Sequence, residues 1–222
     1  MDLTVKICGL STEETLDAAL DAGADIVGFV FFPRSPRFLQ PARAAELAKR
    51  ARRRAEVAAL SVDMDDAALA DVIAALKPDW LQLHGKESAE RVRDVRARFG
   101  VPVMKAIAVA TRADLAAADA YADGADMLLL DAKPPNDATR PGGNGHAFDW
   151  TLLAGFRSSL PYLLSGGLTP ANVAEAIRVS GATGVDVSSG VETAPGRKDS
   201  ALIVRFIANA RAAVKPRQKV AS

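Results

Sequence analysis

Short apolar runs rich in β-branched residues alternate with longer amphipathic stretches along nearly the whole chain. Apolar runs of about four to eight residues predict buried strands, and apolar residues spaced about three or four positions apart predict helices that cover a core. We therefore expect strands at 3–8, 25–31, 56–62, 80–84, 101–107, 126–131, 162–165 and 184–188. Helices are expected near 12–23, 41–54, 65–77, 87–99, 111–123, 149–155, 170–180 and 199–214.

Helix start signals support several of these helices. Ser11 begins a Ser-Thr-Glu-Glu run, in which a hydroxyl and Glu14 three residues later form a capping-box pattern. Pro41 and Pro170 stand where the amphipathic patterns begin, and proline is favoured at the first position of a helix. We expect helices to begin at these points.

The alternation of strand and helix predicts right-handed βαβ units and a parallel sheet. Eight such units favour a single-domain α/β fold of the closed (β/α)8 type, the TIM barrel, over an open doubly wound sheet of about five or six strands. No Pro-, Gly- or Ser-rich linker divides the chain, so we expect one barrel domain over residues 1–214. Residues 215–222 are basic and polar, and we expect a frayed tail there.

Composition and charge exclude several classes of protein. The 222 residues are 49% hydrophobic and 25% charged, which is an ordinary globular composition. The net charge of +1 gives no basic excess for nucleic-acid binding, and the apolar runs are too short to span a membrane. The first residues do not resemble a secretory signal, and a single cysteine, Cys8, allows no internal disulfide. We expect a soluble cytoplasmic protein, with monomer and homodimer both left open.

Polar residues and glycines follow the ends of most predicted strands, although the strands themselves are apolar. In a barrel these loops meet at the carboxyl end of the strands, where active sites lie. The residues concerned are Cys8 and Gly9, 32–37, His84 and Gly85, Asp131, 165–167 and 188–190. Six strand ends of this kind predict one shared site.

Alternation of side chains places Lys6 on the same face of its strand as Cys8, toward the interior of the barrel. Asp186 shares a face with Ser188 on the last strand, which neighbours the first strand in a closed barrel. A buried lysine needs a partner, so Lys6 and Asp186 could pair inside the barrel. The alternative is that Lys6 extends to the barrel floor and keeps its ammonium in water.

Three glycine-bearing loops follow the sixth, seventh and eighth predicted strands. They contain Gly142, Gly143, Asn144 and Gly145, then Ser165, Gly166 and Gly167, and finally Ser188, Ser189 and Gly190. Glycine lets backbone N–H groups approach an anion, and barrels often bind phosphate in the loops after strands seven and eight. One such loop is more often a tight turn, but three neighbouring loops predict a phosphorylated small-molecule substrate.

Several residues at the strand ends offer acid–base or anion-binding chemistry. Asp131 could be a general acid if partial desolvation raises its pKa, or it could be a helix cap or a loop ion pair. Cys8 could be a thiolate base or nucleophile whose pKa Lys6 lowers, or a small buried apolar residue. Arg37 and Arg34 have the fork geometry for a carboxylate or phosphate, although either could be a solvated loop charge.

The two histidines do not indicate a metal site. His84 is a candidate substrate-binding residue at the rim of the barrel. His146 lies in the glycine loop, and no second histidine stands at metal-ligand spacing from either one. We expect no metal and no cofactor.

The order of these motifs resembles the phosphoribosylanthranilate isomerase family. The motifs run from residue 6 to residue 199 and cover nearly the whole chain. They occupy 6–9, 28–31 with 35–37, 82–85, 130–131, 142–145 with 148–150, 165–168 with Asn172, and 186–192 with 195–199. The first and the last are the most specific, because the glycine loops are shared with other phosphate-binding barrels.

The resemblance implies the third step of tryptophan biosynthesis, in which N-(5-phosphoribosyl)anthranilate becomes 1-(2-carboxyphenylamino)-1-deoxyribulose 5-phosphate without a cofactor. By the family pattern, Cys8 is the general base that removes the C2′ proton, and Asp131 is the general acid that protonates the ribose ring oxygen. Arg37 would hold the anthranilate carboxylate, and the three glycine loops would hold the phosphate. Two departures concern those loops: Ser165 stands where alanine is commoner, and Asn144 where a small hydroxyl residue is usual.

Two other kinds of function fit parts of the pattern, namely another enzyme on the same scaffold and a phosphate-binding barrel without catalysis. A histidine-pathway sugar isomerase uses a pair of aspartates, and Cys8 occupies the first of those positions. An indoleglycerol-phosphate synthase needs catalytic Lys and Glu residues in a pattern that the sequence lacks. A phosphate-binding barrel without catalysis has no need for Cys8, Asp131 and Arg37 together, so the isomerase is the preferred interpretation.

Overall fold

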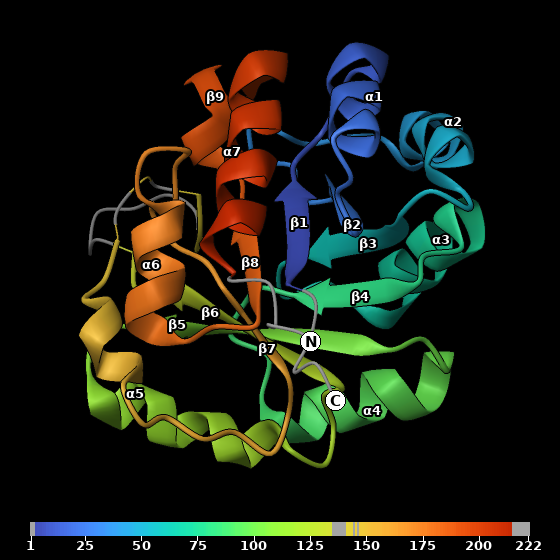
Figure 1. The fold of residues 1–222 in the computed structure, drawn as a ribbon. Coiled ribbons are helices and arrows are strands. Elements are labelled where there is room, and N and C mark those ends of the chain that lie inside the picture. The colour runs from blue at the N-terminus through green and yellow to red at the C-terminus, as the bar shows by residue number, and fades with distance from the viewer. Residues whose placement is uncertain (1–2, 135–140, 144, 146, 215–222) are drawn as a thin grey trace, which may run out of the picture.

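The computed structural model describes residues 3–134, 141–143, 145 and 147–214. Eight parallel strands form a closed barrel in the order of the sequence, and β1 pairs with both β2 and β8. Helices surround the strands on all sides (Figure 1). The predicted (β/α)8 barrel is confirmed, whereas the expected tail at 215–222 lies outside the described residues.

Each predicted strand is present within two residues of its expected ends. The strands are β1 (Thr4–Cys8), β2 (Ile26–Val30), β3 (Glu56–Ser61), β4 (Trp80–Leu83), β5 (Val103–Val109), β6 (Met127–Ala132), β7 (Tyr162–Leu164) and β8 (Gly184–Val187). The α-helices are α1 (Glu13–Asp21), α2 (Pro41–Ala51), α3 (Asp66–Leu76), α4 (Ala89–Phe99), α5 (Arg112–Ala116), α6 (Val173–Ser180) and α7 (Ser200–Ala213). Three short 3-10 helices are η1 (Ala117–Tyr121), η2 (Trp150–Leu153) and η3 (Ser189–Val191).

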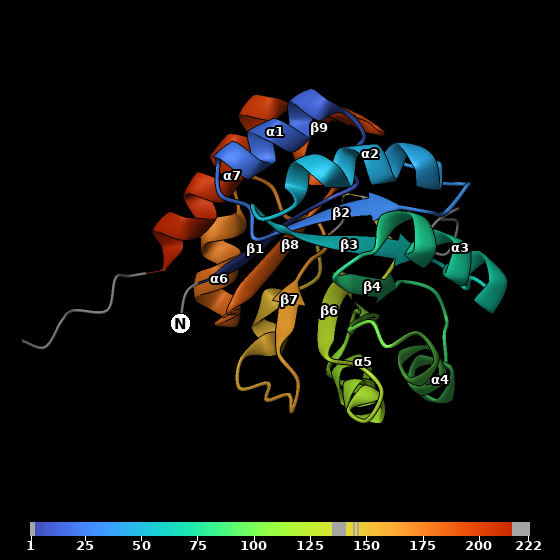
Figure 2. The ribbon, with the colours of Figure 1, turned by 90° about the vertical axis from the view of Figure 1, so that its right-hand side faces the viewer.

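Two apolar layers hold the barrel and leave its carboxyl end to polar residues. The larger layer packs outward-facing strand residues such as Val5 and Ile7 against the helices. The smaller layer fills the interior with Ile26, Ala58, Met104, Leu129 and Leu163. Cys8 and Asp131 lie further along their strands than this interior layer. The arrows of β2 and β3 point toward that end, to the right in Figure 2.

Two of the predicted helix starts are wrong, and the third is confirmed. The first helix has Thr12, not Ser11, as its N-cap, and the Thr12 hydroxyl accepts from a backbone N–H of the first turn. Pro170 lies in a turn before α6, because the Asn172 side chain accepts from the Thr169 N–H and so acts as the cap of that turn. Pro41 is the first residue of α2, as expected.

Two other segments predicted as α-helices form tighter structure. The segment 149–155 forms only η2, and Gly155, two residues after its end, has a φ of +76° in the left-handed region. The segment 111–123 starts as α5 and continues as η1, a tighter helix that is common at the ends of α-helices. The tighter turns place Tyr121 so that its hydroxyl donates to Glu87 O.

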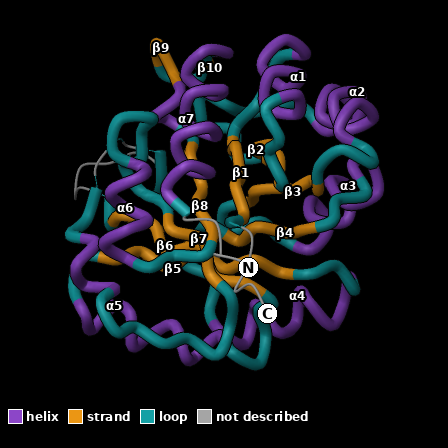
Figure 3. The backbone as a smooth tube through the Cα atoms, viewed as in Figure 1, coloured by secondary structure: helices purple, strands orange, loops and turns teal. Residues whose placement is uncertain are grey.

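The sequence patterns predicted no structure between β8 and the last helix. A short antiparallel hairpin lies there, formed by β9 (Glu192–Ala194) and β10 (Arg197–Lys198). It is a separate two-stranded sheet beside α7 (Figure 3). The hairpin turns at Gly196, whose φ of +81° suits glycine and where a Cβ would collide with Pro36 O.

Candidate active site

A pocket opens at the carboxyl end of the strands, with a volume of about 800 Å³ that includes space open to solvent. Of the predicted strand-end residues, Gly9, Arg34 and Gly85 do not line this pocket, whereas the described candidates for catalysis and substrate binding do. These candidates are Cys8, Arg37, His84, Asp131, Gly142, Gly143, Gly145, Ser165, Gly166, Gly167, Ser188, Ser189 and Gly190. Asn144 and His146 lie outside the described residues. Residues from six strand ends therefore meet in one place.

Cys8 is the last residue of β1 and is 3% exposed. The backbone of β2 comes close to it at Gly28, where a Cβ would lie 3.0 Å from Cys8 Sγ. Burial raises the pKa of the Cys8 thiol above its ordinary value, and the Lys6 and Lys198 ammonium groups offset only part of that effect. The lowered pKa expected from Lys6 is therefore wrong for the thiol as a whole, because desolvation is the larger effect.

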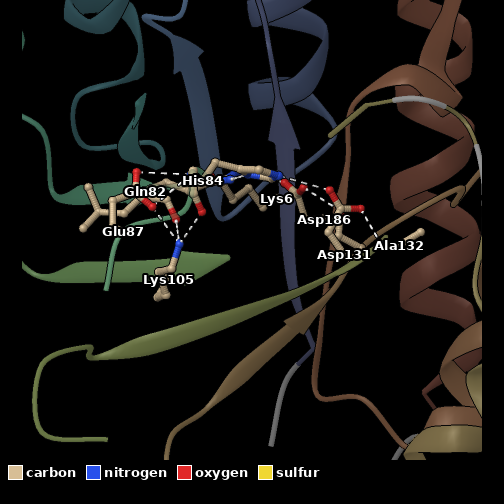
Figure 4. Close-up of polar contacts among 11 residues, drawn as sticks. Lys6, Gln82, His84, Glu87, Lys105, Asp131, Ala132 and Asp186 are labelled. Carbon is tan, nitrogen blue, oxygen red and sulfur yellow. Dashed lines mark hydrogen bonds and ion pairs between the residues drawn. The ribbon is translucent and has the colours of Figure 1, made fainter. Parts of the chain in front are cut away.

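Lys6 is fully buried and pairs with Asp186 (Figure 4). Its ammonium donates to Asp186 Oδ1 over 2.8 Å, and Ser165 Oγ donates to Asp186 Oδ2 over 3.1 Å. Burial alone would lower the pKa of Lys6, but Asp186 and Cys8 outweigh it and hold the pKa above its ordinary value. Of the two alternatives left open for Lys6, the structure shows the pair with Asp186, which keeps a positive charge near the thiol.

Asp131 lies near the end of β6 and is held from two sides (Figure 4). Its Oδ1 accepts from the Ala132 N–H over 2.9 Å, and its Oδ2 lies 3.1 Å from His84 Nε2. His84 Nδ1 in turn lies 2.8 Å from Gln82 Nε2. With the Gln82 amide in this orientation, its Nε2–H donates a hydrogen bond to His84 Nδ1. The ring proton of His84 is then on Nε2, and this N–H donates a hydrogen bond to Asp131 Oδ2. His84 therefore fixes the carboxyl group that points into the pocket.

A second buried ion pair joins Lys105, on β5, to Glu87, in the loop that follows His84 between β4 and α4. Lys105 Nζ donates to Glu87 Oε2 over 2.7 Å and to Gly85 O over 2.8 Å (Figure 4). Burial alone would raise the pKa of Glu87, but Lys105 outweighs it and holds the pKa below its ordinary value. No local sequence pattern predicts this pair, which holds the backbone that follows His84.

Arg37 is 4% exposed and faces the pocket, whereas Arg34 is exposed, as expected for a solvated charge. The Arg37 guanidinium donates from Nε and Nη2 to the two carboxylate oxygens of Glu192 over 2.7 and 2.8 Å. Burial alone would raise the pKa of Glu192, but Arg37 and Lys198 outweigh it and hold the pKa below its ordinary value. Burial lowers the pKa of Lys198 to about 8, although Glu192 opposes this shift.

Glu192 and Lys198 were not among the predicted site residues. Both lie in the last family motif, 186–192 with 195–199, and this membership is the one sequence feature that could have pointed to them. The structure brings both of them to Arg37, which lies 155 positions before Glu192 in the chain.

The glycine loops allow the backbone to approach the acidic group directly. A Cβ at Gly142 would lie 2.5 Å from His84 Nε2 and 2.7 Å from Asp131 Oδ2. Gly166 has φ of +83°, and a Cβ there would collide with the Ala132 N–H. Larger residues at either position would displace the pair of His84 and Asp131.

The described residues, 3–134, 141–143, 145 and 147–214, contain no group of three or more His, Cys, Asp or Glu that could hold a metal ion. No helix in this part of the chain is long and apolar enough to cross a membrane. The titratable groups that do line the pocket include Cys8, Arg37, His84, Asp131 and Asp186.

A closed eight-stranded barrel with a pocket of polar groups at its carboxyl end defines a (β/α)8-barrel enzyme. Residues 5–209 match the family model described as N-(5′-phosphoribosyl)anthranilate (PRA) isomerase. The chain belongs to the N-(5′-phosphoribosyl)anthranilate isomerase family.

Individual relatives agree with the family model. An N-(5′-phosphoribosyl)anthranilate isomerase of Rhodopseudomonas palustris (strain HaA2) is 62% identical over 212 residues, which cover 96% of this chain and 97% of the relative. The crystal structure of phosphoribosyl anthranilate isomerase from Thermotoga maritima has a TM-score of 0.85 and 37% identity, and covers 95% of this chain and 99% of its own. A further solved structure, with a TM-score of 0.80, 34% identity and the same coverage, is in complex with reduced 1-(o-carboxyphenylamino)-1-deoxyribulose 5-phosphate.

Proposed function

We propose that the protein converts N-(5-phosphoribosyl)anthranilate to 1-(2-carboxyphenylamino)-1-deoxyribulose 5-phosphate, with Cys8 as general base and Asp131 as general acid. The observation that carries this proposal is that Cys8, on β1, and Asp131, on β6, line the same pocket. Cys8 is the only thiol in the chain, and Asp131 is held by His84 at the same mouth. The reduced product bound to a solved relative has the same carbon skeleton as the proposed product.

The reaction begins with opening of the ribose ring. The Asp131 carboxyl group donates its proton to the ring oxygen, the bond between C1′ and that oxygen breaks, and the nitrogen lone pair forms an iminium at C1′. His84 and the Ala132 N–H hold the carboxyl group in place for this transfer. An acid in position contributes about 10²- to 10⁴-fold to the rate of such a step.

The iminium makes the hydrogen at C2′ acidic, and Cys8 removes it. The C–H electrons form a C1′–C2′ double bond and the iminium electrons return to nitrogen. The resulting enaminol gains a proton at C1′ and loses one from the C2′ hydroxyl to give the amino ketone. Because burial raises the pKa of the Cys8 thiol, its thiolate is a stronger base than that of an exposed cysteine, and Lys6 stabilises the thiolate charge.

The two acidic ends of the substrate fit two parts of the pocket. The Arg37 guanidinium suits the anthranilate carboxylate because it can donate two parallel hydrogen bonds. The loops that contain Gly143, Gly167 and Gly190 suit the phosphate. Ser165 is one of the two departures from the family pattern. Its hydroxyl donates to Asp186, so only its backbone N–H would be left for the phosphate.

The same proposal places the protein in tryptophan biosynthesis and in the cytoplasm. A homodimer, which the sequence left open beside the monomer, stays a prediction.

The test follows the fluorescence of freshly prepared phosphoribosylanthranilate after mixing with purified protein. The double variant Cys8→Ser, Asp131→Asn is the control that gives the spontaneous breakdown of the substrate. Rapid loss of fluorescence with the wild type alone, with formation of the amino ketone, supports the proposed reaction. Equal rates with the wild type and the double variant would contradict it and favour a binding barrel without catalysis.

A further inference from the structure

The hairpin of β9 and β10 has no part in the proposed reaction, yet its charged side chains reach the wall of the pocket. Both oxygens of Glu192 are fully used. Oε1 accepts from Arg37 Nε over 2.7 Å and from Lys198 Nζ over 2.8 Å. Oε2 accepts from Arg37 Nη2 over 2.8 Å and from the Gly196 N–H over 3.2 Å. The Glu192 carboxylate is therefore locked by two cations and the turn of its own hairpin.

Lys198 connects this carboxylate to the loop after β8. Its three N–H groups have three acceptors, namely Glu192 Oε1, Ser188 O over 2.8 Å and Ser188 Oγ over 3.1 Å. Its side chain is 1% exposed, so the ammonium has no room to move into water. One buried cation thus fixes both Glu192 and Ser188.

Arg37 lines the pocket, and its guanidinium has neighbours on two sides. Glu192 occupies the edge formed by Nε and Nη2, and a Cβ at Gly143 would lie 2.6 Å from Nη1 on the other side. The cluster of Arg37, Glu192 and Lys198 carries two positive charges and one negative charge. It keeps a net positive charge in a buried place, which attracts an anion.

We propose that Glu192 and Lys198 are positioning residues that set the distance between the carboxylate subsite at Arg37 and the phosphate subsite at Ser188. They thereby make the site selective for substrates with an acidic group at each end. The inference rests on the proposed function, because that function assigns the carboxylate to Arg37. Glu192 orients the Arg37 guanidinium, and the Lys198 ammonium donates to Glu192. The same ammonium donates to Ser188 O and so holds the backbone of the loop that begins at Ser188.

The test measures the affinity of two ligands for the wild type and for Glu192→Gln by calorimetry. One ligand is reduced 1-(o-carboxyphenylamino)-1-deoxyribulose 5-phosphate, and the other is its phenylamino counterpart without the carboxylate. Loss of a hydrogen bond to a charged group corresponds to roughly a 10- to 100-fold change in affinity. We expect Glu192→Gln to weaken the carboxylate ligand by about that factor and the counterpart by less than about threefold.

The matched control is Glu87→Gln, which removes another buried glutamate that pairs with a lysine. Glu87 lies behind His84 and does not contact Arg37, so we expect its replacement to leave the ratio of the two affinities unchanged. Lys198→Met is the second variant, in case Glu192→Gln does not fold, and we expect a several-fold loss of the same ratio. Steady-state kinetics of Glu192→Gln and Lys198→Met should agree with the binding data, with KM rising by a larger factor than kcat falls.

Two results would overturn the inference, and they differ in what else they overturn. If both ligands weaken alike in Glu192→Gln and Lys198→Met, the hairpin only stabilises the fold, and the proposed function is untouched. If the wild type itself binds both ligands equally, Arg37 does not hold the carboxylate, and that part of the proposed function fails together with the inference.

Discussion

The two ends of the barrel use ion pairs in different ways. At the amino end, an aspartate stands directly before each of β2, β4 and β6. Its carboxylate accepts a hydrogen bond from a backbone N–H near the start of the preceding strand, and it also forms an ion pair with an arginine. The aspartates and their backbone donors are Asp25 with Val5, Asp79 with Val57, and Asp126 with Val103. These carboxylates are partly exposed, and each has its arginine at the surface.

The ion pairs next to the pocket, toward the carboxyl end, are buried. Lys6 with Asp186, and Arg37 and Lys198 with Glu192, expose at most 5% of any side chain. A solvent-screened pair contributes little to stability, whereas a buried pair carries a large desolvation cost. The amino end thus holds the strands in register with pairs that carry little desolvation cost, whereas the pairs with a large desolvation cost lie where the pocket needs fixed charges.

The largest expected effect comes from the two carboxylates at opposite ends of β6. Asp131→Asn should lower turnover of phosphoribosylanthranilate by about 100- to 10,000-fold, because the amide has no proton to give the ring oxygen. Asp126→Asn, before the same strand, keeps an oxygen for the Val103 N–H and should leave turnover within about twofold. Steady-state kinetics of both variants checks the pair. Equal losses would remove the distinction between the two ends.

The next effect concerns stability. Lys6→Met leaves Asp186 as a buried carboxylate with only Ser165 beside it, and breaking a buried pair in this way costs about 3–5 kcal/mol. Arg96→Met breaks an exposed pair with Asp126 and should leave the unfolding midpoint unchanged within error. Urea unfolding of both variants measures the difference. A Lys6→Met protein as stable as the wild type would show that burial does not distinguish the two ends.

A smaller effect is a pH dependence that only the carboxyl end should show. The pKa of Lys198 is about 8 in the folded protein, against 10.5 for an ordinary lysine, because burial removes its ammonium from water and Arg37 repels it, although Glu192 and Cys8 oppose the shift. Stability from this group is fully present above pH 10.5 and falls by about 3 kcal/mol as pH falls through 8, since the unfolded chain gains the proton first.

The check compares unfolding free energies with and without Lys198→Met between about pH 7 and 10. Both proteins carry Cys8→Ala so that the thiol does not titrate in the same range. The Lys198 protein should gain stability with rising pH relative to its partner. A flat difference would mean that Lys198 has an ordinary pKa.

The smallest effect belongs to the amino end alone. Asp79→Ala removes the acceptor of the Val57 N–H at the start of β3, and an unpaired backbone group of this kind costs about 1 kcal/mol. Turnover per folded molecule should stay unchanged, as a parallel assay would show. A clear loss of turnover would mean that the amino end also shapes the pocket.

The barrel could be predicted from the sequence because each strand carries its own local pattern. The positions of Cys8, His84 and Asp131 could also be predicted, since strand ends converge in a closed barrel. Side-chain alternation placed Lys6 and Asp186 on facing positions of neighbouring strands, but it left open whether they pair or whether Lys6 extends to the barrel floor.

Other features depend on contacts between distant parts of the chain, which no local pattern contains. The Arg37–Glu192 pair joins residues 155 positions apart, and the Lys105–Glu87 pair depends on how a loop folds over β5. The start of α6 was misplaced because Asn172 caps the turn that contains Pro170. The sign of the pKa shift of Cys8 depends on the depth of its burial, which the sequence does not give.

A single-turnover experiment with Cys8→Ala in excess over phosphoribosylanthranilate isolates the role of the thiol. We expect the rate to fall to that of the spontaneous reaction, while the reduced product analogue binds within a few-fold of its affinity for the wild type. Turnover close to that of the wild type would contradict the role of Cys8 as general base, because another group would then have to remove the C2′ proton.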